Sequence, residues 1–290
     1  PTPTPVPAPA PAPENKEEDK QAVKQEKADN TPEAKETKPE DKETKSDDIP
    51  VQDVTNNPPA TQPPNSVNVK DFGAVGDGKV DDQAALQKAV DQAKATGQSV
   101  WIPPGTYNHS GVLTIDGTQV NGAGKDTVLN ATNPDQEAVK LTGDSPSLSN
   151  VKTTVSAPNR SSMPDAAAVL VQNASNATVT HVITQGAASN GIRLDNATGS
   201  HIANNLVLGS NADGIALMNG SGNNLVKGNV VYQAGDDSYS DDSYRGDARQ
   251  DEGNTFDGNL SLDNAYGRGI TLAGSKNAVV KNNIVYGSRW

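Results

Sequence analysis

The sequence predicts an all-β protein, a parallel β-solenoid, on three observations. The folded part repeats about every 23 residues. Each copy holds short alternating apolar runs separated by Gly, Asn and Ser, with no helical pattern between them. The single helical pattern precedes the repeats, where a solenoid needs a lid. Short strands at this spacing, stacked coil on coil, are typical of a solenoid.

Residues 1–64 differ in composition from the rest and predict a disordered tether. Of the 20 prolines in the chain of 290 residues, 14 lie before residue 65. The opening PTPTPVPAPAPAP favours an extended polyproline helix. Residues 14–48 alternate Lys with Glu and Asp and hold almost no large apolar side chain, so they cannot bury enough surface to fold.

Residues 65–110 predict an N-terminal cap on the solenoid. The segment DDQAALQKAVDQAKATG places four apolar side chains on one face of a helix: Leu86, Ala89, Val90 and Ala93. Asp81 or Asp82 can cap the start of this helix, and Gly97 its end. Because a solenoid exposes its core at its end, we expect the helix to act as a lid.

Residues 111–290 predict the solenoid itself. Copies that begin at Ala167, Asn190 and Asp213 follow one another at 23 residues, and another begins at Arg268. Four asparagines each stand directly before an apolar run: Asn205, Asn229, Asn259 and Asn283. Asn tolerates the left-handed turn conformation and bonds to its neighbour in the next coil, so we expect a structural ladder. The final NIVYGSRW offers no cap, and we expect the solenoid to be truncated at its C-terminal end.

Composition excludes some classes of partner. The net charge of -12 argues against nucleic acid, which needs clustered Lys and Arg. No apolar run is long enough to span a bilayer. The absence of cysteine fits a cytosolic protein and equally a secreted one without disulfides. The Pro-rich tether favours a secreted or bacterial cell-surface protein, and we expect a monomer.

The stretch QAGDDSYSDDSYRGD, residues 233–247, crowds four aspartates into two adjacent pairs. One coil separates Asp213 from either Asp236 or Asp237, so one of the pair stacks on Asp213. Matching Ile215 to Tyr239 favours Asp237, although it also sends Asp241 to the position of Leu217, and both registers remain open. Crowded carboxylates raise at least one pKa, which suits general acid and base catalysis. The other acidic residues here are predicted to be solvated loop charges: Asp241, Asp242, Asp247, Asp251 and Glu252.

The next coil is about nine residues longer than a standard one, and the extra length falls in SYRGDARQDEG. Such an insertion often loops out on the binding face. Arg268 then falls in or near the acidic column, where a guanidinium holds a carboxylate or an anionic sugar. Seven of the ten aromatic residues follow position 231. Because sugars stack on aromatic rings, we expect substrate to be bound by Arg268 and three tyrosines: Tyr239, Tyr244 and Tyr266.

The segment VKDFGAVGDGKVDDQAALQKAVDQA, followed by VWIPPGTY, resembles the N-terminal motif of the pectate lyase superfamily. The resemblance covers about residues 65–290 and implies a right-handed, single-stranded parallel β-helix. NADG, GDDS and GRGI further resemble the motifs of polygalacturonase-type glycoside hydrolases. By that resemblance Asp236 is the general acid, and Asp213 and Asp237 activate the attacking water. Arg268 replaces the family's His and no Arg-x-Lys follows, which argues against galacturonan as the substrate.

Three functions follow as hypotheses. The leading one is an inverting glycoside hydrolase that acts on a polysaccharide, neutral or acidic. The second is a polysaccharide lyase or uronate C5-epimerase, although no Lys or His stands in the column to serve as its base. The third is a non-catalytic surface protein that binds glycans. We expect no required cofactor and no dedicated metal site. Ca²⁺ in the Asp-rich loop is the minority alternative, since that ion takes six to eight oxygens.

Overall fold

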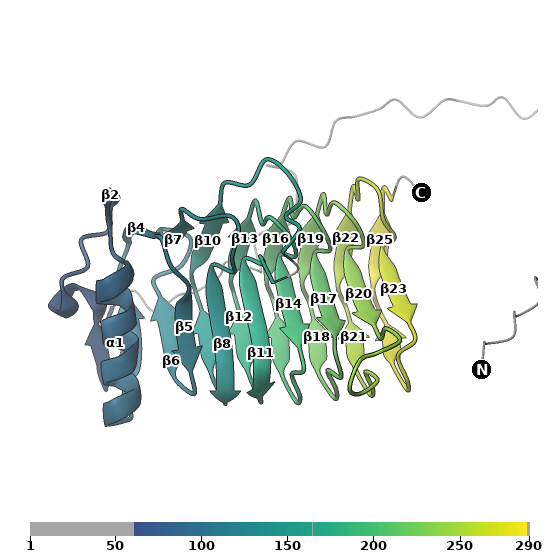
Figure 1. Ribbon diagram of the computed structural model, residues 1–290, viewed down its shortest axis with the longest axis horizontal. Helices are drawn as coiled ribbons and strands as arrows, with labels where there is room; N and C mark the ends of the chain where they lie inside the picture. The colour runs from purple at the N-terminus through teal and green to yellow at the C-terminus, as the bar shows by residue number, and fades with distance from the viewer. Residues whose placement is uncertain (1–60, 164, 289–290) are drawn as a thin grey trace, which may run out of the picture. The chain divides into compact units, whose positions relative to one another are not determined.

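The computed structural model describes residues 61–163 and 165–288, which form a right-handed parallel β-helix (Figure 1). The tether predicted over residues 1–64 lies outside the described residues up to residue 60. Three parallel sheets run along the β-helix, and each full coil adds one strand to each. Within the described part of the chain, no helix has the length and apolar character to cross a membrane.

All strand pairs in the three sheets are parallel, and each sheet follows the order of the chain. Sheet A consists of β1 (Ser66–Asn68), β3 (Ser99–Ile102), β6 (Gln119–Gly122), β9 (Ser147–Ser149), β12 (Thr178–Thr180), β15 (His201–Ala203), β18 (Leu225–Lys227), β21 (Thr255–Asp257) and β24 (Val279–Lys281). Sheet B consists of β2 (Asp77–Asp81), β4 (Gly105–His109), β7 (Thr127–Ala131), β10 (Lys152–Val155), β13 (Ile183–Gln185), β16 (Leu206–Leu208), β19 (Val230–Tyr232), β22 (Leu260–Leu262) and β25 (Ile284–Tyr286). Sheet C consists of β5 (Leu113–Asp116), β8 (Val139–Asp144), β11 (Val169–Ser175), β14 (Ile192–Asp195), β17 (Ile215–Met218), β20 (Tyr239–Asp242) and β23 (Ile270–Ala273).

The predicted helix is present as α1 (Gln83–Thr96), at the N-terminal end of the stack (Figure 1). Its buried side chains are the four that were expected: Leu86, Ala89, Val90 and Ala93. The Asp81 side chain accepts the Gln83 N–H at its start, and Gly97 ends it with φ of 68°. α1 packs on β1, β3, β5 and the short helix η3 (Val69–Phe72). Because β1 to β4 already belong to sheets A and B, the cap and the first coil share residues 66–109.

The interior is a stack of mainly aliphatic side chains, with a few aromatic ones such as Tyr107 and Phe256. The predicted asparagine ladder is confirmed on the edge between sheets A and B. Asn205 donates its side-chain N–H to the Oδ1 of Asn229 (2.9 Å), Asn229 to that of Asn259 (3.0 Å), and Asn259 to that of Asn283 (2.9 Å). Each of these side chains also donates to a backbone carbonyl within the stack. The ladder satisfies buried polar groups at the turn and fixes the register of successive coils.

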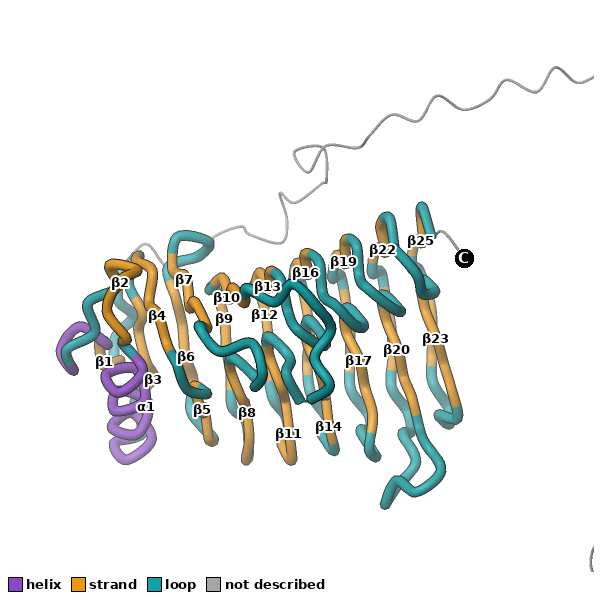
Figure 2. The backbone as a smooth tube through the Cα atoms, turned by 45° about the horizontal axis from the view of Figure 1, so that its top comes forward, coloured by secondary structure: helices purple, strands orange, loops and turns teal. Residues whose placement is uncertain are grey.

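Two loops extend from the β-helix near the strands of sheet C (Figure 2). The first, residues 156–168, joins β10 to β11. It lies over later coils, because the Asn211 side chain donates to the Ala157 carbonyl and the Ser161 N–H to the Ala188 carbonyl. The second is the predicted insertion. We call residues 243–250, which follow β20, the insertion loop.

Candidate active site

The register of sheet C decides how the acidic residues stack. Ile215 pairs with Tyr239, so the offset at this coil is 24 residues and Asp237 stands beside Asp213. The Asp237 N–H donates to the Oδ1 of Asp213 at 3.1 Å. Each aspartate lies two residues before its strand, β17 or β20. The register that the match of Ile215 to Tyr239 favoured is therefore confirmed.

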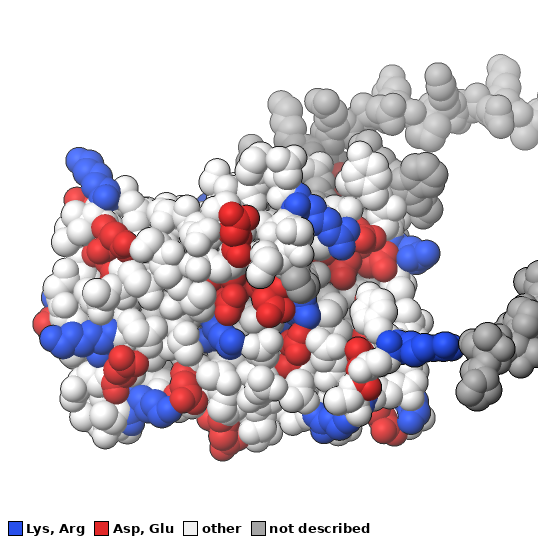
Figure 3. Space-filling view, in the orientation of Figure 1, with Lys and Arg blue, Asp and Glu red and all other residues white. Residues whose placement is uncertain are grey.

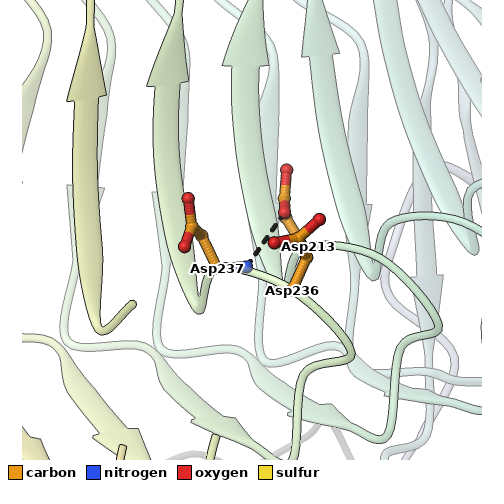
Figure 4. Close-up of side chains that lie close together, drawn as sticks. All are labelled: Asp213, Asp236 and Asp237. Carbon is orange, nitrogen blue, oxygen red and sulfur yellow. Dashed lines mark hydrogen bonds between the residues drawn. The ribbon is translucent and has the colours of Figure 1, made fainter. Parts of the chain in front are cut away.

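Asp213, Asp236 and Asp237 form a compact group, the carboxylate cluster (Figure 4). One carboxylate oxygen from each lies within 4.8 Å of the other two. Asp213 is 9% exposed and Asp237 6%, whereas the side chain of Asp236 is 43% exposed. The cluster thus has two shielded members and one that faces solvent.

Close packing of the turns around the cluster depends on glycine. A Cβ on Gly214, directly after Asp213, would lie 2.5 Å from the Ser238 carbonyl of the next coil. A Cβ on Gly267 would lie 2.1 Å from the backbone carbon of Asp236. Only glycine allows the coils to approach so closely at these two positions. The DG and YG steps of the sequence therefore help to bring the carboxylates together.

Polar neighbours hold the two shielded carboxylates. The Oδ2 of Asp213 accepts the Ser240 hydroxyl at 3.0 Å and the Asn190 amide at 3.3 Å. The Oδ1 of Asp237 accepts the backbone N–H of Arg268 at 2.6 Å. The Arg268 guanidinium lies 3.7 Å from the same carboxylate and is 72% exposed. Arg268 thus positions Asp237 mainly through its backbone, and its side chain is free to reach a ligand.

Asp236 has a partner from far along the chain. The guanidinium of Arg160, in the loop of residues 156–168, contacts its carboxylate at 2.9 Å. Figure 3 shows the resulting surface, where acidic and basic side chains lie side by side on the face that sheet C forms. Arg160 was not predicted, because the 76 residues that separate it from Asp236 leave no local signal in the sequence.

Burial raises the pKa of Asp213 to about 6, the negative charges of Asp236 and Asp237 add to the rise, and the hydrogen bond from Ser240 opposes it. Burial likewise raises the pKa of Asp242 to about 6, with contributions from the charges of Asp237 and Asp241. These values bring two carboxyl groups near the cluster into the range where a proton is exchanged close to neutral pH.

A cavity of about 390 Å³ opens beside the cluster. Its lining includes Asp213, Asn190, Arg160, Arg193 and Tyr244. Arg193 is buried and bridges Asp195 at 2.6 Å and Asp165 at 3.4 Å. Asn190 and Arg193 were not predicted, although Asn190 stands one 23-residue repeat before Asp213 and the repeat could have pointed to it.

The three predicted tyrosines occupy different environments. The ring of Tyr244, in the insertion loop, is 63% exposed, and burial by its surroundings raises its pKa, with smaller effects from Asp242 and Asp213. Tyr266 is 73% exposed, directly before Gly267, which packs on Asp236. Tyr239 is 1% exposed and donates to the carbonyls of Asn229 and Leu260. Tyr239 is therefore a core residue, and its prediction as a substrate contact was wrong.

The predicted solvated charges need a similar correction. Asp241 and Asp251 are fully buried and Asp242 is 8% exposed, so for these three the prediction was wrong. The 24-residue register is the reason, since it places Asp241 opposite the buried Leu217. Asp247 is partly exposed and Glu252 exposed, in agreement with the prediction.

Comparison with known proteins places this arrangement among carbohydrate-active β-helices. Residues 66–289 match the family described as rhamnogalacturonase A/epimerase, pectate lyase-like. Mannuronan C5-epimerase AlgE6 of Azotobacter vinelandii is 45% identical over 86 residues, which are 26% of this chain and 10% of the epimerase. This chain therefore corresponds to a small part of that relative.

Three solved structures share the fold. The A-module of the same epimerase superposes with a TM-score of 0.54 and 22% identity, over 74% of this chain and 69% of that one. The catalytic domain of a family 87 α-1,3-glucanase gives 0.64 and 17%, over 80% and 41%. PfbA, a surface adhesin of Streptococcus pneumoniae, gives 0.53 and 16%, over 76% and 62%.

These neighbours include an epimerase, a hydrolase and an adhesin, so the shared fold does not by itself select a reaction. The match over residues 66–289 extends across nearly all the described residues. The chain belongs to the rhamnogalacturonase A/epimerase, pectate lyase-like family.

Proposed function

We propose that this protein hydrolyses glycosidic bonds of a polysaccharide, with Asp213, Asp236 and Asp237 as its catalytic carboxylates. The observation that carries the proposal is the carboxylate cluster itself, in which two successive coils bring three carboxylates within 4.8 Å beside a cavity. Glycoside hydrolysis needs one carboxyl group that donates a proton and another that stays ionised.

The proposed roles follow from exposure and environment. Asp236 is the most exposed of the three and delivers the proton to the oxygen of the leaving sugar. Asp213, with its pKa raised to about 6 by burial, is the adjacent source of that proton. Asp237, held by the Arg268 backbone N–H, activates the water. Tyr244 and Tyr266 supply exposed rings on which sugar faces stack.

The contact with Arg160 must break before Asp236 can take up a proton. Both side chains are more than two-fifths exposed, and an ion pair of this kind contributes little stability. A sugar that enters the cavity, which Arg160 also lines, displaces the guanidinium at small cost.

The separation of the carboxylates bears on stereochemistry. Inverting enzymes keep their two carboxyl groups roughly 6.5–9.5 Å apart to admit a water. One oxygen from each carboxylate of the cluster lies within 4.8 Å of the other two, so the geometry gives no support to the expected inversion. Proton NMR of the first-formed anomer decides between inversion and retention.

The α-1,3-glucanase offers a parallel in spacing. Two of its structures, with tetrasaccharides and with nigerose, are of variants in which an aspartate is replaced by alanine, and the two sites lie 24 positions apart. Asp213 and Asp237 are also 24 positions apart. A spacing of 24 residues is one coil here, so both pairs of positions fit neighbouring coils of a β-helix. A glucan therefore belongs among the substrates to be tested.

A second candidate is a lyase or uronate C5-epimerase, favoured by the similarity to the mannuronan C5-epimerase. In that case the exposed Arg268 guanidinium neutralises the uronate carboxylate, and a carboxylate of the cluster removes the C5 proton. An elimination yields an unsaturated sugar and an epimerisation leaves the chain intact, so the products separate all three reactions.

The proposed hydrolysis requires no cofactor. The cluster also offers three carboxylates to a divalent cation, but Arg160 and Arg268 already neutralise part of its charge. A Ca²⁺ site would raise the melting temperature with added Ca²⁺ and lower it with a chelator. We propose that the protein acts when secreted or at the cell surface, the location that the Pro-rich composition of residues 1–64 favours.

The test is a polysaccharide panel, neutral and acidic, assayed for reducing ends and for unsaturated products. Asp236→Asn is expected to lower turnover by at least about a hundredfold, the usual contribution of general acid catalysis, while oligosaccharide binding persists. Glu252→Gln, at an exposed carboxylate of the same coil, is the matched control and retains full activity. Full activity in Asp236→Asn rules out the proposed acid. Binding without any turnover in the wild type indicates the third hypothesis, a glycan-binding protein.

A further inference from the structure

A carboxylate lies inside the β-helix core, where every neighbouring coil has an aliphatic side chain. Asp241 of β20 pairs with Leu217 in the preceding coil and with Leu272 in the next. It is fully buried. Asp251, at the far end of the insertion loop, is fully buried as well. Both carboxyl groups have lost their hydration, which is costly unless each finds a partner.

The two buried carboxyl groups lie within side-chain hydrogen-bonding reach of one another. A hydrogen bond between two carboxyl groups forms only if one of them carries a proton. Asn254 donates to both oxygens of Asp241, at 3.2 and 3.3 Å, and the Gly220 N–H donates to the Oδ1 of Asp251 at 2.6 Å. The Oδ2 of Asp251 is buried and accepts no hydrogen bond from any described residue. None of the salt bridges among the described residues includes Asp241 or Asp251.

The pair closes the base of the insertion loop. The loop starts two residues after Asp241 and ends at residue 250, directly before Asp251. The Asp251 N–H also donates to the Ser243 hydroxyl at 2.8 Å, so the two ends of the loop meet. The loop carries Tyr244, whose ring lines the cavity together with Asp213. What holds the base of the loop therefore also places Tyr244 at the site.

We propose that Asp241 and Asp251 share one proton, and that this proton keeps the base of the insertion loop closed and so positions Tyr244 beside the carboxylate cluster. The closing of the loop is a property of the fold. Its consequence for turnover rests on the proposed function. In that case Asp241 and Asp251 are positioning residues for Tyr244 and do not contact the substrate themselves.

The surroundings of the pair favour one proton over two charges. Burial raises the pKa of Asp251 to about 8, and the hydrogen bond to Asp241 adds to the rise. Burial raises the pKa of Asp241 too. The nearest titratable neighbours along the chain, Asp242 and Glu252, are carboxyl groups as well, and the Arg249 guanidinium is bound to the Asn196 side chain. Lys276 on the next coil donates its backbone N–H to the Asp251 carbonyl at 2.9 Å, and its ammonium group forms no salt bridge with either carboxyl group among the described residues.

Closing of the insertion loop is expected to weaken as the pH rises. A carboxyl group whose pKa is raised in the closed state stabilises that state fully below its ordinary pKa of about 4. That stabilisation is lost as the pH rises towards 8. Over this range, each pH unit favours opening by up to about tenfold, because opening releases one proton.

Limited proteolysis reports the opening directly. The loop offers trypsin two exposed sites, Arg245 and Arg249. Cleavage at these sites is measured at pH 6, 7 and 8 on the full chain, by mass spectrometry of the fragments. Each rate is divided by that of a free peptide with the sequence of residues 243–250. The wild-type ratio is expected to rise by about tenfold to a hundredfold from pH 6 to 8.

Asp251→Asn keeps the shape and can donate to Asp241 without a titrating proton, so its ratio should change by less than about twofold over the same range. Glu252→Gln is the matched control and should follow the wild type. If Asp251→Asn fails to fold, Asp241→Asn takes its place. The same rise in wild type and variant overturns the proposal. So does suppression of the rise by added Ca²⁺, because a cation and not a proton then joins the pair. The measurement needs no substrate, so failure of the hydrolase assignment leaves it intact.

Discussion

Two successive coils of this β-helix share the asparagines that bond from coil to coil, and they differ in the residues near the carboxylate cluster. The coil of Asp213 contains β17, β18 and β19, and the coil of Asp237 contains β20, β21 and β22. Both place an asparagine before the strand of sheet A and another before that of sheet B: Asn224 and Asn229 in the first, Asn254 and Asn259 in the second. These amides bond directly from coil to coil.

The differences all fall in the second coil. Where the first coil has Leu217 in the core, the second has Asp241. Where the first has Ser221, the second has Asp251, as the bridge of Gly222 to Glu252 shows. The second coil also carries the insertion loop. The asparagine ladders hold successive coils in register. Positions between the ladders can therefore carry a catalytic or charged side chain in place of one that packs the core.

The largest expected effect on stability comes from giving the first coil the core aspartate of the second coil. Leu217→Asp places a carboxyl group where no counterpart of Asp251 waits for it. The cost is expected to be about 3–5 kcal/mol of unfolding free energy, because the new buried carboxyl group lies in register with Asp241 and adds a second carboxyl group to the same column. Urea denaturation at pH 8 measures it, and Leu217→Met, which keeps volume, should cost less than about 1.5 kcal/mol. A loss below about 1 kcal/mol in Leu217→Asp means that this core tolerates charge without the pair.

A smaller effect on stability is expected from breaking the asparagine ladder that the two coils share. Asn229 is buried, and its side chain joins Asn205 to Asn259 and also donates to the Ile202 carbonyl. Asn229→Ala leaves buried groups on both sides unsatisfied, at about 1–3 kcal/mol. Thermal unfolding measures the change against Gln92→Ala, on the exposed face of α1. Equal stability of the two variants means that the ladder is a result of the coil register and does not stabilise it.

The ladder and the cap were predictable because each depends on a pattern that repeats. The helical spacing of Leu86 and Ala89 and the placing of Asn205 and Asn229 before apolar runs are local facts of the sequence. The stacking of Asp237 on Asp213 was predictable only in part, since the match of Ile215 to Tyr239 favoured it while the sequence left both registers open.

The buried pair and Arg160 were not predictable on these grounds. Asp241 stands in an acidic run rich in Ser, which read locally indicates a solvated loop, although the match of Ile215 to Tyr239 sends it to the position of Leu217. Only the strand register turns its side chain into the core, and only the return of the chain after the insertion brings Asp251 to meet it. Arg160 reaches Asp236 through a loop that crosses several coils. Contacts of this kind depend on the fold as a whole.

The smallest expected change in stability comes from Asp213→Asn, which gives this position the residue type found one coil earlier. Asn190, in the coil before, pairs in register with Asp213, since Ile192 pairs with Ile215. Asp213→Asn keeps the acceptor for the Asp237 N–H and removes a charge from the cluster. Because burial raises the pKa of Asp213 to about 6, its stabilising contribution is complete below about pH 4 and is lost as the pH rises through 6.

Asp213→Asn is therefore expected to raise the unfolding free energy by about 1–2 kcal/mol at pH 8 and to leave it unchanged at pH 4. The same variant should lower turnover by at least about a hundredfold, so that stability and activity move in opposite directions. Urea denaturation at both pH values, beside the polysaccharide assay, measures the two effects. Asp257→Asn is the control of opposite sign, because a hydrogen bond from Asn282 lowers the pKa of Asp257. The contribution of Asp257 is complete above its ordinary pKa of about 4 and is lost as the pH falls through the lowered value. If Asp213→Asn is less stable than the wild type at pH 8, the carboxylate is a structural member of the column, and the catalytic assignment loses the residue on which its proton supply depends.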